Sequence, residues 1–431
     1  MLRSVRYCLR LQKCYYSVNP SNEEDLNSII CRQIRSAGPI SVSEYMKLSL
    51  HHPIHGYYKT SSVIGPEGDF LLGIWIVSES MKYGKNTPFE IVEFGPGRGS
   101  LMTSVLTSLN KFPAANSLFR HLRFIERSDS LRKQQESAIF SVLKTCHSSL
   151  DVTWHSSLDE IPTGTTSFYL ANEFLDALPI HRFQKVDGKW REVFVDAINP
   201  SNPIEPGDHL TFITSPSDTM ASTTYLPFID DLSEKTIVEV CPDGGALVQK
   251  MASRIAADGG SALIVDYGHV GERQDTLRAF KNHELHDPLK DPGQADITAD
   301  VDFAFLRRSV EAANKPGMFK LDLTFCAPIL NLFFNNFLLT LVVVHGPVSQ
   351  AYFLIHMGIL LRLKNLVART KNEEEKQKLI ASTEMLVGTN QMGKRFKFMA
   401  ITAGRSEKEK QSIPAGFYPT WQTGEEEQSA S

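Results

Sequence analysis

The feature that most constrains this chain of 431 residues is an alternation of short apolar strands with helices, which begins at residue 89. Strands that are separated by helices must be joined by crossover connections, and such connections give a mostly parallel sheet with helices on its faces. The expected strands are 89–94, 122–126, 152–154, 167–171 and 262–266, and the expected helices are 100–109, 130–144 and 245–257. The alternation therefore predicts a doubly wound α/β fold.

A glycine-rich turn joins the first of these strands to its helix. It reads Glu-Phe-Gly-Pro-Gly-Arg-Gly from Glu93 to Gly99, with further glycines at Gly95 and Gly97. Glycine lets the backbone turn sharply and approach a ligand without a Cβ atom in the way, and the helix start that follows offers free N–H groups. The spacing differs from the G-x-G-x-x-G of dinucleotide sites. An acid two residues before the first glycine is typical of methyltransferases, although a turn that uses glycine only for packing would look the same.

Acidic residues after the next two strands extend this candidate cofactor site. Glu126 ends the second strand, where a carboxylate can accept hydrogen bonds from both ribose hydroxyls of a nucleoside. The alternative for Glu126 is a solvated acid at a strand end. Asp159 follows the third strand and could bind the adenine amino group, although an acid in a surface loop is an equal interpretation.

A second cluster, Asn-Glu-Phe-Leu-Asp-Ala-Leu-Pro, runs from Asn172 to Pro179 at the carboxyl end of the fourth strand. Ligands of open α/β sheets bind outside the carboxyl ends of the strands. Glu173 and Asp176 are three residues apart and can face one pocket. Because a guanidinium presents a planar fork of donors that pairs with carboxylates, two such acids can hold an arginine side chain. A helix N-terminus, where the helix dipole favours acids, explains the pattern equally well.

Composition and the chain ends limit the function and the compartment. A net charge of −4 argues against non-specific nucleic-acid binding, and six cysteines without a C-x-x-C argue against a disulfide framework or a zinc site, so we expect no metal. Residues 1–22 contain four basic residues and no acid, which is the pattern of a mitochondrial transit peptide; the alternative is a disordered basic tail. We expect residues 404–431 to form a disordered polar tail.

Other short motifs are spread along the chain, in addition to the two described above. The full set is Gly38-Pro39-Ile40, Glu44-Tyr45-Met46, Gly56-Tyr57-Tyr58, Gly68-Asp69-Phe70, Glu93 to Gly99, Asn172 to Pro179, Val265-Asp266-Tyr267-Gly268, Pro292-Gly293, Asp296-Ile297-Thr298-Ala299 and Val301-Asp302-Phe303. Together they resemble the MidA family of mitochondrial arginine methyltransferases, which assist the assembly of respiratory complex I. The resemblance covers most of residues 36–315 and again about 346–402.

The resemblance implies a class I S-adenosylmethionine-dependent methyltransferase. It implies a seven-stranded sheet over residues 89–403, an N-terminal helical cover over 23–88 and a substrate lobe inserted at about 180–240, within which Asp187-Gly188 predicts a hairpin. The implied reaction is symmetric dimethylation of an arginine on a matrix-arm subunit of complex I, in the mitochondrial matrix. The implied S-adenosylmethionine ligands are Glu93, Gly95, Gly97, Gly99, Glu126 and Asp159, the catalytic acids are Glu173 and Asp176, and the substrate contacts are Asn172, Tyr267 and Asp296.

Two departures from the family pattern bear on activity. Phe70 runs directly into Leu71, where the family has about a dozen further residues close to the cofactor. Residues 316–344 resemble nothing in the family, and 323–344 are 22 uncharged residues, long enough for a transmembrane helix. We expect a defective or alternative splice product that binds S-adenosylmethionine weakly and is poorly soluble. The competing interpretations are a membrane anchor at 323–344 and a catalytically impaired assembly factor that keeps the fold.

Overall fold

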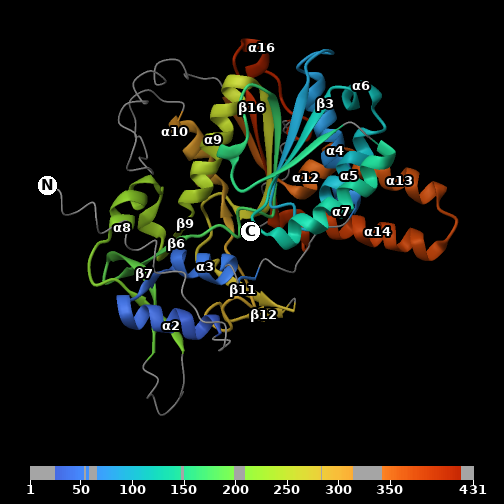
Figure 1. Cartoon of the computed structure of the whole chain (residues 1–431). Helices are drawn as coiled ribbons and strands as arrows, with labels where there is room; N and C mark the ends of the chain where they lie inside the picture. The colour runs from blue at the N-terminus through green and yellow to red at the C-terminus, as the bar shows by residue number, and fades with distance from the viewer. Residues whose placement is uncertain are drawn as a thin grey trace.

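A central sheet organises the residues that the computed structural model describes, which are 25–52, 55–57, 66–146, 150–198, 209–282, 284–313 and 342–418. A smaller lobe, which contains α2, α3, β11 and β12, lies below this sheet in Figure 1. The strands of the central sheet are β2 (Phe89–Phe94), β3 (Phe119–Ile125), β4 (Asp151–His155), β5 (Thr166–Asn172), β10 (Gly260–His269), β14 (Val301–Asp302), β15 (Val342–Ser349) and β16 (Phe396–Ala403).

The strand order is β15-β16-β10-β5-β2-β3-β4, with the short β14 beside β10. The strands β2, β3, β4, β5 and β10 pair in parallel, whereas β16 is antiparallel to its neighbours β10 and β15. These seven strands confirm the predicted doubly wound, seven-stranded sheet. The order reverses between β2 and β5, and open α/β sheets bind ligands at such a reversal, outside the carboxyl ends of the strands.

Helices cover both faces of the central sheet. One face packs against α4 (Pro66–Met81), α5 (Ser100–Leu109), α7 (Asp129–Cys146), α12 (Gln350–His356) and α14 (Glu373–Val387), in a core that contains Trp75, Phe124 and Phe353. The other face packs against α9 (Pro242–Asp258) and α10 (Phe303–Ala313), in a core that contains Val92 and Ile264. Helix α13 (Ile359–Arg369) and α14 extend together away from the sheet (Figure 1).

The smaller lobe contains two sheets. The five-stranded sheet consists of β1 (Ile40–Ser41), β6 (His181–Val186), β7 (Lys189–Ala197), β8 (Leu210–Thr214) and β9 (Ile237–Val240), and the three-stranded sheet consists of β11 (Arg278–Lys281), β12 (Glu284–His286) and β13 (Asp296–Thr298). Strands β6 and β7 pair antiparallel around Asp187 and Gly188, whose φ angles are 49° and 74°. Positive φ at both central residues is what a tight hairpin turn requires, so the predicted hairpin is confirmed.

The N-terminal region divides between the lobe and the central sheet. Helices α2 (Leu26–Ala37) and α3 (Val42–His51) share a core with the lobe, in which Ile30 and Tyr45 are buried together with Val195 and Ile297. Helix α4 packs instead on the central sheet. Residues 23–88, which we expected to form one helical cover, therefore take part in two separate cores.

Two expectations about the C-terminal part are corrected. Residues 342–344, placed by the sequence in an unrelated apolar insertion and a candidate transmembrane span, begin β15 at the sheet edge, where Val342 pairs with Ala403. Residues 404–418, expected in a disordered tail, include α16 (Glu407–Lys410) and a buried Phe417 that packs on Phe353. The rest of both segments, and the predicted transit peptide 1–22, lie outside the described residues.

A helix that spans a membrane must be both long and apolar. Within the described part of the chain, no single helix is both long and apolar enough. Helices α12 and α13 meet the criterion only as a pair, and a bend of 65° separates them.

Candidate active site

The glycine-rich turn lies at the carboxyl end of β2 and adopts a conformation that few residues other than glycine can take. The φ angles of Gly95, Gly97 and Gly99 are 58°, 55° and 82°. A Cβ atom on Gly95 would lie 2.7 Å from Cδ2 of Phe174, so this position also needs glycine for space. Gly99 caps α5, whose first N–H groups point toward the turn. The turn can therefore bring the backbone close to a ligand at the switch point of the sheet.

Gln135 of α7 connects this turn to Glu126, a role that no local pattern in the sequence indicates. Its side chain is fully buried, and Nε2 donates to the carbonyl oxygen of Gly97 at 2.7 Å and to Glu126 Oε2 at 3.2 Å. Trp154 Nε1 donates to Oε1 of the same glutamine at 2.8 Å. The other oxygen of Glu126 accepts from the backbone N–H of Ser128 at 2.7 Å. Glu126 is thus held beside the glycine turn, where burial raises the pKa of its carboxyl group.

Asp159 has no described hydrogen bond to this arrangement. Its side chain is 67% exposed, and Oδ2 accepts from Nζ of Lys250 at 2.7 Å on the surface of α9. The exposed ion pair favours the interpretation of Asp159 as an acid of a surface loop, and a role in binding the adenine amino group stays a prediction.

Glu93 is a buried carboxylate with an unmatched oxygen. It is the residue before the last of β2 and is 2% exposed, and Oε2 has no hydrogen-bond partner among the described residues. Burial and the nearby carboxyl group of Asp69 raise its pKa to about 8. Asp69 of α4 is itself 3% exposed, and burial raises its pKa to about 7. Two buried acids that lack a described cation between them form a place where a bound cation is strongly favoured.

The turn after β5 holds a half-buried acid, Glu173, with one buried oxygen. Glu173 has a left-handed backbone with φ of 46°, and its N–H donates to the carbonyl oxygen of Val265 at 2.9 Å. Its Oε1 atom is buried without a hydrogen-bond partner among the described residues. Burial, followed by the charges of Asp176, Asp296 and Asp69, raises the pKa of Glu173 to about 8. A buried polar atom without a partner needs an explanation, and a ligand cation supplies one.

Asp176 lies three residues further along the same turn. It is 7% exposed, and burial raises the pKa of its carboxyl group well above the usual range, with further contributions from Asp266 and Asp296. The guanidinium of Arg278 acts in the opposite direction. Glu173 and Asp176 therefore contribute to one electrostatic cluster, as their spacing in the sequence suggested.

The remaining predicted substrate contacts also lie at this cluster. Asn172 is the last residue of β5 and pairs with Val265 of β10. Asp296, on β13 of the lobe, is near enough to raise the pKa values of Glu173 and Asp176. Tyr267 of β10 is half-buried, and burial and the charges of Glu173 and Asp176 raise the pKa of its phenol. The lobe and the central sheet thus both supply side chains to the site.

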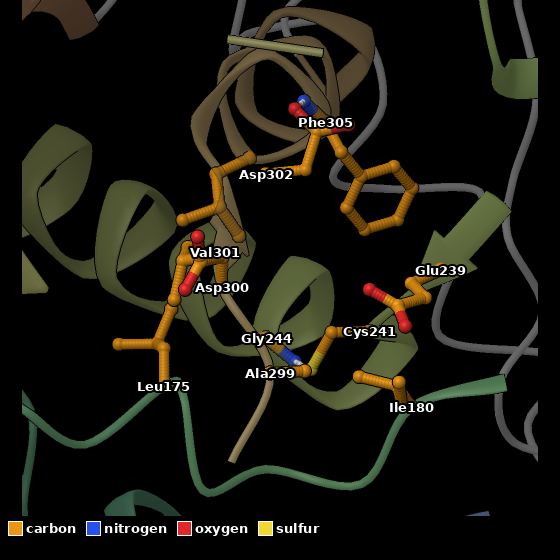
Figure 2. Close-up of a pocket in the computed structure, with 11 residues that line it drawn as sticks. Leu175, Ile180, Glu239, Cys241, Gly244, Ala299, Asp300, Val301, Asp302 and Phe305 are labelled. Atoms are coloured by element: carbon orange, nitrogen blue, oxygen red, sulfur yellow. Dashed lines mark hydrogen bonds between the residues drawn. The ribbon is translucent and has the colours of Figure 1, made fainter. Parts of the chain in front are cut away.

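The cavities described in the structure do not coincide with the acidic cluster. The smaller one has a volume of about 20 Å³, room for roughly one water molecule, and lies between Leu175, Cys241 and Phe305 (Figure 2). Figure 2 also shows the carboxylates of Glu239 and Asp300 around it. A more open hollow of about 590 Å³ lies on the lobe beside Trp190. Neither cavity adjoins the glycine turn, so the buried acids and the glycine turn, and not a cavity, define the candidate site. In the described part of the chain, no group of three or more possible metal ligands occurs.

The chain is similar in sequence to a family of methyltransferases and to several of their named members. A family model described as an S-adenosyl-L-methionine-dependent methyltransferase matches residues 71–319. The rat protein named protein arginine methyltransferase NDUFAF7, mitochondrial, is 38% identical over 422 residues, which cover 90% of this chain and 88% of the rat protein. The human protein of the same name is 38% identical over 397 residues, covering 86% and 81%. The Drosophila melanogaster homologue is 38% identical over 415 residues, covering 89% and 87%.

Two solved structures from Burkholderia thailandensis have a similar fold. One superimposes with a TM-score of 0.69 at 23% identity and covers 91% of this chain and 94% of its own. The other, bound to S-adenosyl-homocysteine, superimposes with a TM-score of 0.66 at 21% identity and covers 88% and 92%. Both likenesses extend over the central sheet and the lobe together, because they cover nearly the whole chain.

Proposed function

Since the chain belongs to this family of S-adenosyl-L-methionine-dependent methyltransferases, we propose that it transfers a methyl group to an arginine side chain of a mitochondrial protein. The observation that carries the proposal is the pair of buried carboxylate oxygens without described partners, Glu93 Oε2 and Glu173 Oε1, at the ends of neighbouring strands. One acid suits the cationic end of the cofactor and the other suits a cationic substrate.

The residues at the end of β2 and β3 fit S-adenosylmethionine. Glu93 would bind the ammonium group of its methionine part, because a buried carboxylate with an unmatched oxygen is stabilised by a cation. Glu126 would accept from the ribose hydroxyls, since its two oxygens can accept more hydrogen bonds than the ones they receive from Ser128, Gln135 and Arg127. The backbone of Gly95 and Gly97 would lie against the cofactor. When bound, the cofactor would supply a methyl group that is already activated on a sulfonium.

Glu173 and Asp176 would hold the arginine substrate. A guanidinium remains charged at all physiological pH values and pairs with two carboxylates through its planar fork. Binding of this cation would favour the ionised form of Glu173, whose pKa burial and neighbouring acids raise to about 8. The pair would fix the plane of the guanidinium and so aim one nitrogen at the methyl group, which lowers the barrier chiefly through proximity and alignment. Asn172, Tyr267 and Asp296 would border the bound side chain.

We further propose symmetric dimethylation of a complex I subunit in the mitochondrial matrix. The support is the resemblance to the MidA family, the mitochondrial relatives, and the basic, acid-free character of residues 1–22. In this proposal the lobe, with its insertion at about 180–240, is the part that meets the protein substrate, because β13 of the lobe carries Asp296 to the acidic cluster.

The proposal can be tested by incubating the purified chain with methyl-labelled S-adenosylmethionine and a mitochondrial matrix extract. Mass spectrometry of the labelled proteins should find the label on arginine, with symmetric dimethylarginine as the end product. Label on lysine or on a small metabolite would contradict the arginine assignment, and label on an arginine outside complex I would contradict the proposed substrate.

A further inference from the structure

Asp266 is a fully buried acid of β10 whose contacts differ from those of Glu93 and Glu173. Its side chain is 0% exposed. Oδ2 accepts from the backbone N–H groups of both Leu175 and Asp176, at 2.9 and 3.2 Å, and Oδ1 accepts from its own neighbour Tyr267 at 2.9 Å. Both oxygens are therefore engaged by backbone donors, so this carboxylate has no unmatched atom to offer a ligand.

Two of the three N–H groups that donate to Asp266 belong to the turn that carries Glu173 and Asp176, the proposed ligands of the guanidinium. Leu175 and Asp176 are separated from Asp266 by about ninety residues of sequence, and the contact exists only because β5 and β10 are adjacent and parallel. The N–H of Glu173 is held by the carbonyl oxygen of Val265, the residue before Asp266. Residues of β10 thus form hydrogen bonds with both ends of the Glu173–Asp176 segment.

These hydrogen bonds with β10 explain how Glu173 keeps an unfavourable backbone conformation. A residue other than glycine at φ of 46° is uncommon, and such strain persists only when the surroundings fix the chain on both sides. The donors from Leu175 and Asp176 fix the chain directly after Glu173, and Val265 fixes it directly before. Without the bond to Asp266, the turn could relax and move the carboxylate of Glu173.

We propose that Asp266 is a positioning residue for arginine methylation, which holds the Glu173–Asp176 turn so that both acids face the guanidinium. The inference rests on the proposed function, since it assigns to Glu173 and Asp176 the substrate role given above. Asp266 acts through the backbone of these residues and does not itself touch the substrate.

The contacts at this position require two acceptor oxygens on the side chain. Three backbone N–H groups donate to the two oxygens of the Asp266 carboxyl group, and both of these oxygens can accept. In Asp266→Asn, an NH₂ group replaces one of the two acceptor oxygens, and this group donates and cannot accept. In either orientation of the amide the NH₂ group would face a backbone N–H group, so at least one of the three hydrogen bonds would be lost. The size of the side chain would stay the same, which makes Asn the informative substitution.

The test compares Asp266→Asn with the parent chain in methyl transfer to a matrix extract, in calorimetry with S-adenosylmethionine, and in amide hydrogen exchange of a peptide covering residues 172–179. We expect the maximal rate to fall by about 100-fold, the size of loss that a small misplacement of a reacting group produces. The dissociation constant and KM for S-adenosylmethionine should stay within about twofold of the parent values. Exchange at residues 175 and 176 should become faster.

Glu90→Gln is the matched control, and Asp266→Glu is the second variant. Glu90 is also a buried acid, at 1% exposure, and it binds Arg123 and Ser167 on the same sheet. Its substitution should lower the melting temperature without changing the maximal rate or the exchange of residues 175 and 176. Asp266→Glu keeps the charge but moves the carboxylate by one methylene, so it should show the same loss of rate if Asp266→Asn does not fold.

The outcomes separate the inference from the proposed function. An unchanged maximal rate in folded Asp266→Asn would overturn the inference, and so would a loss of rate matched by an equal loss of cofactor affinity. If the parent chain transfers no methyl group to arginine, the proposed function fails, and the exchange measurement still decides whether Asp266 holds the turn: unchanged protection at residues 175 and 176 would overturn that as well.

Discussion

Glu173 combines a left-handed backbone, a buried oxygen without a described partner, and a pKa raised to about 8. Each feature raises the free energy of the folded chain when no cation is bound. Strain and unmatched polar groups of this kind are found at sites where a ligand or a reaction makes use of them. A substrate guanidinium would satisfy the orphaned oxygen and favour the ionised carboxylate at once.

Replacing Glu173 with Gln should remove methyl transfer while cofactor binding remains. Gln has nearly the same size but lacks the charge that pairs with a guanidinium, and the loss of one such preorganised contact is worth roughly 2–4 kcal/mol of activation free energy. The maximal rate should therefore fall by about 30- to 1,000-fold, measured with labelled S-adenosylmethionine. Glu136→Gln, the same change at an exposed position of α7, is the control. A parental rate in Glu173→Gln would show that this acid does not hold the substrate.

The raised pKa values also predict how the stability of the ligand-free chain depends on pH. Asp69 has a pKa of about 7, and Glu93, Glu173 and Asp266 have values of about 8. Acids in an unfolded chain titrate near 4, so between these values the folded state binds more protons than the unfolded state. The free energy of unfolding must then fall as the pH rises through this window.

The melting temperature of the ligand-free chain should accordingly decrease between pH 6.5 and 8.5, as a thermal scan at constant ionic strength would measure. Half-buried His345, whose pKa is lowered to about 4 chiefly by burial, acts in the opposite direction, but most of its effect lies below the usual histidine value of about 6.5. The double change Glu93→Gln with Glu173→Gln should flatten the decrease. A melting temperature that stayed constant or rose over this range would contradict the buried acidic cluster.

At the scale of elements, α4 contains the point, between Phe70 and Leu71, at which this chain lacks about a dozen residues of the family. The helix runs without a break through Phe70 and Leu71, with Leu71 and Trp75 buried against the central sheet. Its first turns still carry Asp69 to the neighbourhood of Glu93. Asp69 therefore still lies near Glu93 although the family's residues after Phe70 are missing, and for this reason we predict cofactor binding in place of the weak binding expected from the sequence.

Two glycines of α4 should respond in opposite ways to replacement by alanine. A Cβ atom on Gly73 would lie 2.5 Å from Cβ of Ser108 on α5, whereas one on Gly68 would lie 3.7 Å from the nearest atom, in Leu386. Gly73→Ala should force the two helices apart and lower the free energy of unfolding by about 1–3 kcal/mol. Gly68→Ala should raise it by about 0.4–1 kcal/mol through reduced freedom of the unfolded chain. Urea unfolding would measure both, and equal effects would refute the packing of α4 on α5.

The elements that could be predicted from the sequence are those with strong periodicity between clear turn residues. Strands β2, β3, β5 and β10 and helices α5, α7 and α9 all occur where the alternation predicted them. Strand β15 was missed because its first residues, from Val342, continue an apolar run that carries no turn signal. The start of α4 is hard to predict from the sequence, because Pro66 and Gly68 are typical of a loop, although proline is also common in the first turn of a helix.

At the scale of the whole molecule, the site is assembled from five regions that are distant in sequence: Asp69, residues 93–135, residues 172–176, residues 266–267 and Asp296. Residues after β2 and β5 could be recognised, since each follows an apolar strand and carries its own local pattern. Gln135, Asp69 and Asp266 could not, because their roles depend on contacts with Gly97, Glu93 and the turn after β5 that only the folded chain creates. A buried glutamine inside a helix, in particular, has no local signal that separates it from a surface residue.

Calorimetric titration with S-adenosylmethionine, of the purified parent chain and of Gly97→Val, measures whether the proposed cofactor site binds its ligand. We expect one-to-one binding by the parent chain, because Glu93, Glu126 and the glycine turn are all in place despite the missing residues after Phe70. We expect no binding by Gly97→Val, because a β-branched residue is strongly disfavoured at φ of 55° and its side chain would occupy the cofactor's place. A correctly folded parent chain that released no heat, or a Gly97→Val variant that bound as tightly as the parent, would contradict the assignment of the site.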